Sequence, residues 1–459
     1  MQLNDIKTIY FVGIGGIGMS ALARYFNGRG VAVHGYDRTS TPLTVALEAE
    51  GMHIHYQEAP ELIPDQVDLV VYTPAVPNTH RELQYFKTHG FPIKKRAEVL
   101  GIISRSKKTV AIAGTHGKTT TSSITAHLLQ EGGLDCTAFL GGIAQNYGSN
   151  YIDGQSEWVV VEADEFDRSF LHLSPDLSGI LSMDADHLDI YGDAQSLLET
   201  GFQAFAKKRK PGGKLWVQQD FVSDFSGQER VASFGLETGT YRAEQIRVEG
   251  GYFCFDYTNP NIRMKDLRFT MPGRHNVENA TLAITIALEL GISETAIRKG
   301  LQNFKGIQRR FELVYRDEEI AFYDDYAHHP TELKAAINAA RALFPERKIT
   351  GVFQPHLFSR TRDFADGFAE ALSTLDELLL LDIYPARELP IEGVTSDWLA
   401  QKIKNTNVHR VQLDNALDTI KKKVPEVLLT LGAGDISTLV PQIKQYLTKR
   451  KAATLASPD

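Results

Sequence analysis

The residues best suited to chemistry lie in a glycine-rich turn that follows an apolar segment, residues 109–113. Backbone amides of such a turn can cradle phosphate oxygens, the Lys118 ammonium can neutralise nucleotide β- and γ-phosphates, and the Thr119 hydroxyl can ligate Mg²⁺. The turn departs from strict P-loop spacing, because Ile112 stands where the first glycine is expected. Its strand–turn–helix context still favours nucleotide binding over a purely structural turn. The predicted ATP-binding residues here are Gly114, Thr115, His116, Gly117, Lys118, Thr119 and Thr120.

An earlier glycine-rich turn follows another apolar segment, residues 9–13, and fits the G-x-G-x-x-G pattern. In that pattern a pyrophosphate lies against backbone amides at the start of a helix. Asp37 follows the next predicted strand, residues 31–36, where a carboxylate could bind a ribose hydroxyl. The alternative is a tight turn that only packs a helix closely. The predicted ligand-binding residues are Gly13, Ile14, Gly15, Gly16, Ile17, Gly18 and Asp37.

The two turns together indicate two phosphorylated ligands in two domains. A dinucleotide-dependent dehydrogenase would use the first turn and leave the second unexplained. A kinase or a switch ATPase would use the second turn and leave the first unexplained. The turns alone leave these classes open.

Acidic residues follow two predicted buried strands that come after the second turn. The strand at residues 158–161 is followed by Glu162, Asp164, Glu165 and Asp167, and the strand at residues 178–182 by Asp184, Asp186, His187 and Asp189. Carboxylates at strand ends near a P-loop are placed to hold Mg²⁺ directly or through water. A solvated acidic loop is the alternative. The pattern predicts a magnesium site, with His187 as a plausible further metal ligand.

Polar residues also end several predicted strands in the last third of the chain. The strand at residues 319–323 runs into Asp324-Asp325-Tyr326-Ala327-His328-His329. The strand at residues 349–353 runs into Gln354-Pro355-His356, with Arg360 shortly after. Because carboxyl ends of parallel strands lie along one sheet edge, we expect a single site there. Earlier in the chain, His275, Asn276 and Asn279 begin a helix, where they could cap it or bind a base edge.

The elements that must position these residues alternate between apolar strands and helical patterns. Such alternation predicts an α/β protein with parallel sheets flanked by helices. A length of 459 residues, at roughly 150 per domain, predicts three domains. We expect boundaries near residues 106 and 312, which give domains 1–106, 107–312 and 313–459.

Composition excludes several other classes of protein. The net charge is −8 and the chain has no long basic block, so nucleic-acid binding is disfavoured. The two cysteines, Cys136 and Cys254, are far apart, which excludes a disulfide framework or a cysteine zinc site. No apolar run is long enough to span a membrane. A cytoplasmic location is expected.

Several segments in order resemble the Mur ligases of peptidoglycan synthesis, from residue 9 to about residue 437. They read GIGGIGMS, GTHGKTTT, EADE, DADHLD, GRHNVENA, DDYAHHPTE, FQPHLFSRT and AGD. The resemblance implies a Rossmann-like domain for a UDP-linked substrate, a central P-loop ATPase domain, and a Rossmann-like C-terminal domain that binds the amino acid. It also accounts for both turns, because the first would hold the UDP diphosphate rather than a dinucleotide.

The resemblance also implies roles for individual residues. Lys118 would contact the ATP phosphates, and Thr119 and Glu162 would hold one Mg²⁺ ion. His187 would join a second ion. The remaining implied roles are adenine or nucleotide contacts by Asn276, Asn279 and Arg310, and amino-acid or acyl-phosphate contacts by Tyr326, His328, His356 and Arg360. The catalytic residues would be Lys118, His187, His328 and Arg360, and either His328 or His329 could accept the proton of the amine.

The implied reaction joins L-alanine to the lactyl carboxylate of UDP-N-acetylmuramate through an acyl phosphate, with ATP and two Mg²⁺ ions. A recycling ligase that adds a murein tripeptide to the same sugar is the alternative. Phe166 leans toward the recycling ligases, and Leu357 stands where many members have arginine. The segment 201–203 lacks the lysine that several sister ligases carbamylate, so we expect no carbamate. The expected assembly is a monomer or a homodimer.

Overall fold

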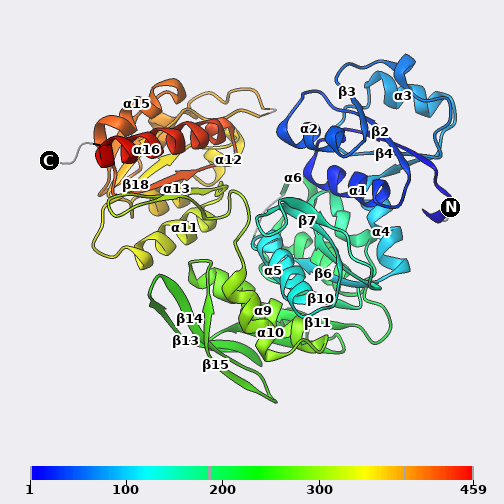
Figure 1. The fold of residues 1–459 in the computed structure, drawn as a ribbon, viewed down its shortest axis with the longest axis horizontal. Coiled ribbons are helices and arrows are strands. Elements are labelled where there is room, and N and C mark those ends of the chain that lie inside the picture. The colour runs from blue at the N-terminus through cyan, green and yellow to red at the C-terminus, as the bar shows by residue number, and fades with distance from the viewer. Residues whose placement is uncertain (1–2, 185–187, 387, 457–459) are drawn as a thin grey trace. The chain divides into compact units, whose positions relative to one another are not determined.

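A computed structural model describes residues 3–184, 188–386 and 388–456. The chain forms an α/β protein built on three sheets in which parallel pairing dominates (Figure 1). Its residues cluster into two compact units. The first comprises Met1–Gln245, Phe255–Arg268 and Glu278–Lys305, and the second comprises Ile246–Cys254, Phe269–Val277 and Gly306–Asp459. No helix among the described residues combines the length and hydropathy needed to cross a membrane.

The first sheet has five parallel strands in the order β3-β2-β1-β4-β5. The strands are β1 (Thr8–Val12), β2 (Ala32–Tyr36), β3 (His53–His55), β4 (Leu69–Tyr72) and β5 (Ile93–Lys95). The helices are α1 (Ile17–Asn27), α2 (Pro42–Ala49), α3 (Arg81–Thr88) and α4 (Arg96–Ser106). The strand order reverses beside β1, and open α/β sheets bind ligands at the carboxyl ends of strands at such a point. The first glycine-rich turn lies there.

The second sheet has ten strands in the order β15-β14-β13-β12-β11-β10-β6-β9-β7-β8. The strands are β6 (Lys108–Ala113), β7 (Thr137–Ala144), β8 (Ser149–Ile152), β9 (Trp158–Ala163), β10 (Leu177–Ile180), β11 (Lys214–Gln218), β12 (Val231–Leu236), β13 (Tyr241–Glu249), β14 (Tyr252–Thr258) and β15 (Arg263–Phe269). The helices are α5 (Lys118–Glu131), η3 (Phe166–His172), α6 (Leu188–Tyr191), α7 (Ala194–Ser196), η4 (Leu197–Phe202), α8 (Gln203–Ala206), α9 (Arg274–Glu289) and α10 (Glu294–Asn303). The P-loop strand β6 is central and pairs in parallel with β9 and β10. The carboxyl ends of all three therefore lie at one edge.

The third sheet has six strands in the order β16-β17-β21-β18-β19-β20, with only β16 antiparallel. The strands are β16 (Glu312–Arg316), β17 (Ala321–Asp325), β18 (Ile349–Phe353), β19 (Glu377–Leu380), β20 (Asn407–Arg410) and β21 (Val427–Leu431). The helices are α11 (Pro330–Leu343), α12 (Phe358–Asp363), α13 (Ala365–Leu372), α14 (Ser396–Ala400), α15 (Leu413–Lys423) and α16 (Leu439–Ala456). Helices α11, α13 and α14 share a core with one face of the sheet, and α15 and α16 share a core with the other.

Of the two strands predicted in the third sheet, one is confirmed and the other is shifted. The strand predicted at 349–353 matches β18. The strand predicted at 319–323 instead runs from Ala321 to Asp325, so Asp324 and Asp325 belong to the strand itself. Asp324 can be buried in a strand because its carboxylate accepts a hydrogen bond from Thr430 and pairs with Arg309.

Within the first unit, helix α1 packs against β7 and β8 as well as against its own sheet. One hydrophobic core runs through both sheets and includes Tyr25, Phe139 and Tyr151. The Tyr25 ring lies 5.5 Å from the Phe139 ring and 6.5 Å from the Tyr151 ring, measured between centroids. Asn150, fully buried, donates hydrogen bonds to the Ile17 carbonyl and the Ser20 hydroxyl at the start of α1. The start of α1 is thereby fixed to the sheet that carries the P-loop.

Candidate active site

The second glycine-rich turn joins the buried strand β6 to helix α5, as the sequence predicts. Gly114 and Gly117 have φ values of 137° and 81°, which residues other than glycine rarely adopt. A Cβ atom at Gly117 would lie 2.6 Å from the Asn279 side-chain oxygen. The Thr115 amide donates to the Ser182 carbonyl, and the His116 amide donates to the Ser182 hydroxyl. These contacts hold the turn against the end of β10, while Thr120 is buried in α5.

Lys118 is held by a carboxylate that sequence reasoning grouped with the metal ligands. Its Nζ atom lies 2.8 and 3.0 Å from the two carboxylate oxygens of Glu165 and 2.7 Å from the Gly114 carbonyl oxygen. Burial by itself lowers the pKa of Lys118, but the carboxylates of Glu165, Asp164 and Glu162 outweigh it and hold that pKa above its ordinary value. The lysine is therefore a permanently charged group. The Glu165 side chain is only 1% exposed, so the pair is shielded from solvent.

Thr119 and Glu162, predicted to share a metal ion, lie side by side. The Thr119 hydroxyl donates to a carboxylate oxygen of Glu162 at 2.8 Å. Glu162 lies near the carboxyl end of β9, which places it at the P-loop edge of the sheet. A hydroxyl and a carboxylate are oxygen ligands that suit Mg²⁺. Among the described residues no set of three His, Cys, Asp or Glu side chains forms a metal cluster, and His187 lies outside them.

A cavity of about 290 Å³ lies between the first glycine-rich turn and the end of β9. The turn contributes Gly16, Ile17 and Gly18, and the strand end contributes Glu162 with Asp164 and Phe166. Other lining residues include Thr73, Arg96, Leu140 and Gly141. The cavity therefore joins one predicted phosphate-binding turn to a carboxylate that touches the other.

Arg96 is a cationic residue of this cavity that sequence reasoning missed. A Cβ atom at Gly18 would lie 2.6 Å from an Arg96 guanidinium nitrogen, so the glycine leaves room for the guanidinium beside the start of α1. The nearest carboxylate pair, to Asp164, is 3.8 Å long. The one feature of the sequence that could have indicated Arg96 is its position directly after β5, a strand of the first sheet.

The other residues of the first turn have structural contacts. The amides of Gly13 and Ile14 both donate to the Tyr36 carbonyl, and the Ile14 side chain is fully buried. Asp37 accepts a 2.7 Å hydrogen bond from the Gly15 amide. The Asp37 carboxylate thus supports the turn, which is a different contact from the predicted ribose hydroxyl.

The two asparagines of α9 are both buried. Asn276 donates through its side chain to the Pro272 carbonyl at 2.6 Å. That bond ties the first turn of α9 to the segment before it, and both roles predicted for Asn276, helix capping and contact with a base, stay predictions. Helix α9 begins at Arg274, one residue before the predicted group. Asn279 lies beside Gly117 in the P-loop, as the close approach of its oxygen indicates.

In the second unit, Tyr326, His328 and His356 lie together after β17 and β18. The ring of His328 lies 5.2 Å from the Tyr326 ring and 6.0 Å from the His356 ring. His356 in turn stacks on Tyr384 at 5.7 Å. Leu357, which precedes α12 and its Arg360, has a φ of 70°, a strained value for a residue with a side chain. The sequence predicts these residues along one sheet edge, and in the structure the three rings lie together.

Two arginines and an aspartate shape the loop before these rings. Arg310 lies over the Tyr326 ring at 5.4 Å, and Arg309 lies over the same ring at 5.0 Å. Asp325 accepts hydrogen bonds from the amides of Phe311 and Ala327, both at 2.7 Å. Burial raises the pKa of Asp325 to about 7, with Arg310 opposing that effect. Arg309 had no predicted role, and it holds Asp324 in place.

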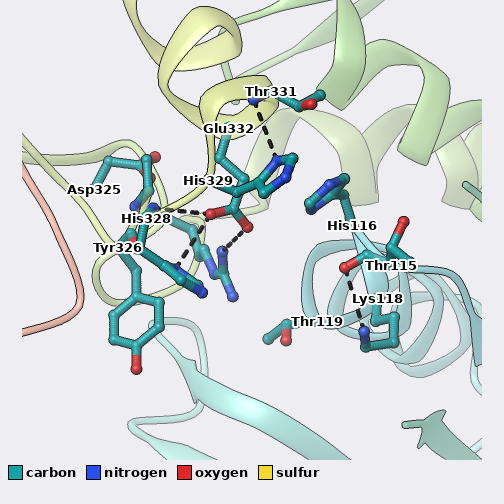
Figure 2. A network of polar contacts seen from close by, with 12 residues as sticks. Thr115, His116, Lys118, Thr119, Asp325, Tyr326, His328, His329, Thr331 and Glu332 are labelled. Atoms are coloured by element: carbon teal, nitrogen blue, oxygen red, sulfur yellow. Dashed lines mark hydrogen bonds and ion pairs between the residues drawn. The ribbon is translucent and has the colours of Figure 1, made fainter. Parts of the chain in front are cut away.

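His328 and His329 differ in their contacts although they are adjacent. His328 Nδ1 lies 2.9 Å from the Tyr326 carbonyl oxygen and 3.2 Å from a Glu332 carboxylate oxygen. His329 Nδ1 instead accepts a hydrogen bond from the Thr331 amide and caps helix α11 (Figure 2). Burial and the nearby Arg360 and Arg310 lower the pKa of His328, while Glu332 opposes them. The two histidines are thus set up for different tasks.

Comparisons with known proteins identify the family. Successive family models match the chain: the Mur ligase family catalytic domain over residues 8–108, the Mur ligase middle domain over residues 112–287, and the Mur ligase glutamate ligase domain over residues 309–434. The chain belongs to the Mur ligase family. The predicted family and its three-domain α/β architecture are confirmed.

Relatives narrow the comparison within this family. The UDP-N-acetylmuramate–L-alanine ligase of Flavobacterium johnsoniae is 50% identical, and the match covers 98% of this chain and 100% of that one. The crystal structure of the UDP-N-acetylmuramate-alanine ligase of Thermotoga maritima is 29% identical, with a TM-score of 0.83, and the match covers 96% and 99% of the two chains. A murein peptide ligase of Psychrobacter arcticus is 22% identical with a TM-score of 0.69, covering 95% and 98%, a likeness of fold alone.

Proposed function

We propose that this Mur ligase joins L-alanine to the lactyl carboxylate of UDP-N-acetylmuramate, with conversion of ATP to ADP and phosphate. The observation that carries the proposal is the cavity shared by the first glycine-rich turn and Glu162, which itself contacts the P-loop residue Thr119. A substrate diphosphate at the turn and an ATP phosphate at the P-loop would meet there. The near-complete match to alanine ligases at 46–50% identity supports the choice of substrates.

The first half of the reaction needs charge neutralisation. Forming an amide from a carboxylate is uphill in water. The carboxylate therefore first attacks the γ-phosphorus of ATP, the bond from that phosphorus to the bridging oxygen breaks, and ADP leaves as the acyl phosphate forms. Two anions must approach for this step, and the fixed charge of Lys118 reduces their repulsion. Thr119 and Glu162 would hold Mg²⁺, which supplies further positive charge at the phosphates. His187 is proposed for a second ion.

The nucleotide and the first substrate would also be held by residues away from the reacting atoms. Asn276, Asn279 and Arg310 are proposed to contact the nucleotide, with the remaining P-loop residues around its phosphates. Residues 13–18 and Asp37 are proposed to hold the UDP portion, and Arg96 adds a cation to the same cavity. These residues are proposed to set the affinity for ATP and for the UDP-linked substrate.

The second half of the reaction needs a neutral amine. The alanine nitrogen attacks the acyl carbon, a tetrahedral intermediate forms, and phosphate leaves with the original carboxylate oxygen. His328 is proposed to accept the amine proton, since its lowered pKa keeps the imidazole neutral at working pH. Tyr326, His356 and Arg360 would hold the alanine carboxylate or the acyl phosphate.

The acceptor distinguishes this proposal from the recycling ligase. Phe166, the residue that favours recycling, lines the cavity with Gly16 and Glu162 in the first unit, whereas the acceptor residues belong to the second. We therefore assign no acceptor preference to Phe166. The enzyme is proposed to act in the cytoplasm on small molecules, without a nucleic acid or a membrane, as a monomer or homodimer.

An acceptor panel tests the proposal. Phosphate release is measured with ATP, Mg²⁺ and UDP-N-acetylmuramate against L-alanine, glycine, L-serine and L-alanyl-γ-D-glutamyl-diaminopimelate. We expect the highest kcat/KM with L-alanine, and weak turnover with glycine because one methyl group is worth about 1–3 kcal/mol. Faster turnover with the tripeptide would make this a recycling ligase. Steady ATP hydrolysis without any acceptor would instead support a switch ATPase.

A further inference from the structure

We propose that Glu332 is a positioning residue that fixes His328 in the tautomer able to accept the amine proton. Glu332 lies in the first turn of α11, four residues after His328. The inference rests on the proposed ligation, because it concerns the step in which the amine loses its proton. It selects one of two adjacent histidines and names the side chain that orients it.

The tautomer follows from what faces each ring nitrogen. His328 Nδ1 faces a carbonyl oxygen and an ionised carboxylate oxygen, and both groups only accept hydrogen bonds. Nδ1 must therefore carry the proton of the neutral ring, which leaves the lone pair on Nε2. A general base needs that lone pair on the side that meets the substrate.

His329 has the opposite arrangement. Its Nδ1 accepts a hydrogen bond from the Thr331 amide, so the lone pair of Nδ1 is already used to cap α11. The proton of neutral His329 then lies on Nε2, and the ring packs against Phe364 at 4.7 Å. His329 is 7% exposed. Its contacts make it a helix cap rather than a base.

Glu332 braces His328 at two points. One carboxylate oxygen accepts a 2.9 Å hydrogen bond from the His328 amide and also lies 3.2 Å from His328 Nδ1. The other oxygen lies 3.6 Å from the Arg310 guanidinium. The side chain is 15% exposed, so water competes weakly for these contacts. Ring and backbone are thus fixed together by a single carboxylate.

The charges around His328 give Glu332 an electrostatic role as well. The charges of Arg360 and Arg310 lower the pKa of the imidazole and weaken it as a base, and the rings of Tyr326 and His356 lie beside it. Glu332 is the carboxylate that opposes the arginines. Removing its charge should leave a weaker base in a looser orientation.

The test uses Glu332→Gln in the full chain, with hydroxylamine as a second acceptor. Hydroxylamine is already neutral at pH 8 and can trap an acyl phosphate without a base. We expect L-alanine-dependent turnover to fall by about tenfold or more, with hydroxamate formation within about threefold of wild type. The acid limb of kcat/KM for L-alanine should move to lower pH.

Two further variants control for a merely structural effect. Glu370→Gln removes an exposed carboxylate that pairs with Lys334 of α11, and it should leave every rate unchanged. In a His328→Ala background, Glu332→Gln should cost less than about threefold, because its partner is gone. Glu332→Asp keeps the charge and should keep the acid limb near its wild-type position.

The outcomes separate this inference from the proposed function. If the wild-type chain forms no product from L-alanine and UDP-N-acetylmuramate, the proposed function fails, and this inference fails with it. If the wild type is active and Glu332→Gln keeps its rate and pH profile, only the inference fails. Equal loss of alanine and hydroxylamine turnover, or full additivity with His328→Ala, also overturns it. If Glu332→Gln does not fold, Glu332→Asp takes its place. A folded Glu332→Asp chain whose kcat/KM for L-alanine no longer shows the wild-type acid limb would also overturn the inference.

Discussion

The P-loop region and the edge of the third sheet shift the pKa of their nitrogen bases in opposite directions. Lys118 is surrounded by carboxylates, which raise its pKa and keep it charged although it is buried. Burial lowers the pKa of His328 and keeps the imidazole neutral, with Arg360 and Arg310 adding to that effect and Glu332 opposing it. The first arrangement suits the neutralisation of phosphates, and the second suits the removal of a proton. One chain thus keeps a permanent cation and a titratable base in different environments.

A glutamate fixes each of these two reactive groups, Lys118 and His328. Glu165 holds Lys118 through both of its oxygens, and the Tyr191 hydroxyl donates to the Glu165 carbonyl. Glu332 holds His328 through its amide and its ring. In both regions a buried or half-buried glutamate orients the reactive nitrogen. The difference is that one glutamate sustains a charge and the other directs a lone pair.

The largest expected effect is at Lys118. Lys118→Ala should reduce ligation by about a hundredfold or more, because a fixed charge at the transferring phosphate is lost. Steady-state phosphate release, with circular dichroism to confirm folding, provides the measurement. Lys108→Ala is the matched control, since Lys108 is half exposed and pairs with Glu157 at the other end of β6. Near-normal turnover in a folded Lys118→Ala chain would remove the P-loop region from the mechanism.

A comparable loss of activity is expected on substitution of Arg360, near the edge of the third sheet. Leu357 supplies no cation, so Arg360 should carry much of the alanine carboxylate or acyl-phosphate charge. Arg360→Ala should lower kcat/KM for L-alanine by about a hundredfold and leave the KM for UDP-N-acetylmuramate nearly unchanged. Arg362→Ala, at an exposed residue paired with Asp363, serves as the control. Equal effects in the two variants would contradict a specific role for Arg360.

The smallest effect is expected at Gly18. Gly18→Ala places a methyl group where the Arg96 guanidinium lies, so the KM for UDP-N-acetylmuramate should rise about fivefold or more, roughly 1 kcal/mol. The KM for L-alanine should change little. Gly227→Ala is the control, because a Cβ atom there meets nothing within 4 Å. A larger change in the KM for L-alanine than in the KM for UDP-N-acetylmuramate would contradict the assignment of the UDP substrate to the first glycine-rich turn.

The sequence predicts those parts of the fold that depend on local burial. The segments at 109–113, 349–353 and 427–431 are apolar runs between turn residues, and each forms a buried strand. Strands β13 and β15 had no comparable signal, because charged side chains interrupt them and they are only partly buried. Strand β14, which lies between them, is buried over most of its length.

The candidate site was predictable only where its residues lie in motifs. Thr119 and Glu162, which belong to two such motifs, contact each other at one sheet edge, and the metal ion predicted between them stays a prediction. The Lys118–Glu165 pair depends on which way a loop turns after β9, and neighbouring acidic residues give no sign of that. Arg96 depends on the missing side chain at Gly18, a contact between distant segments. The roles of all these residues remain predictions, and His187 lies outside the described residues.

The most direct test of the account follows one oxygen atom through the reaction. UDP-N-acetylmuramate labelled with ¹⁸O in its lactyl carboxylate is converted with ATP and L-alanine, and the released phosphate is analysed by mass spectrometry. The carboxylate oxygen that attacks the γ-phosphorus leaves with the phosphate when the amine displaces it. The acyl-phosphate route predicts one labelled oxygen in each phosphate from a fully labelled carboxylate. Unlabelled phosphate, formed together with the amide product, would contradict the acyl-phosphate route.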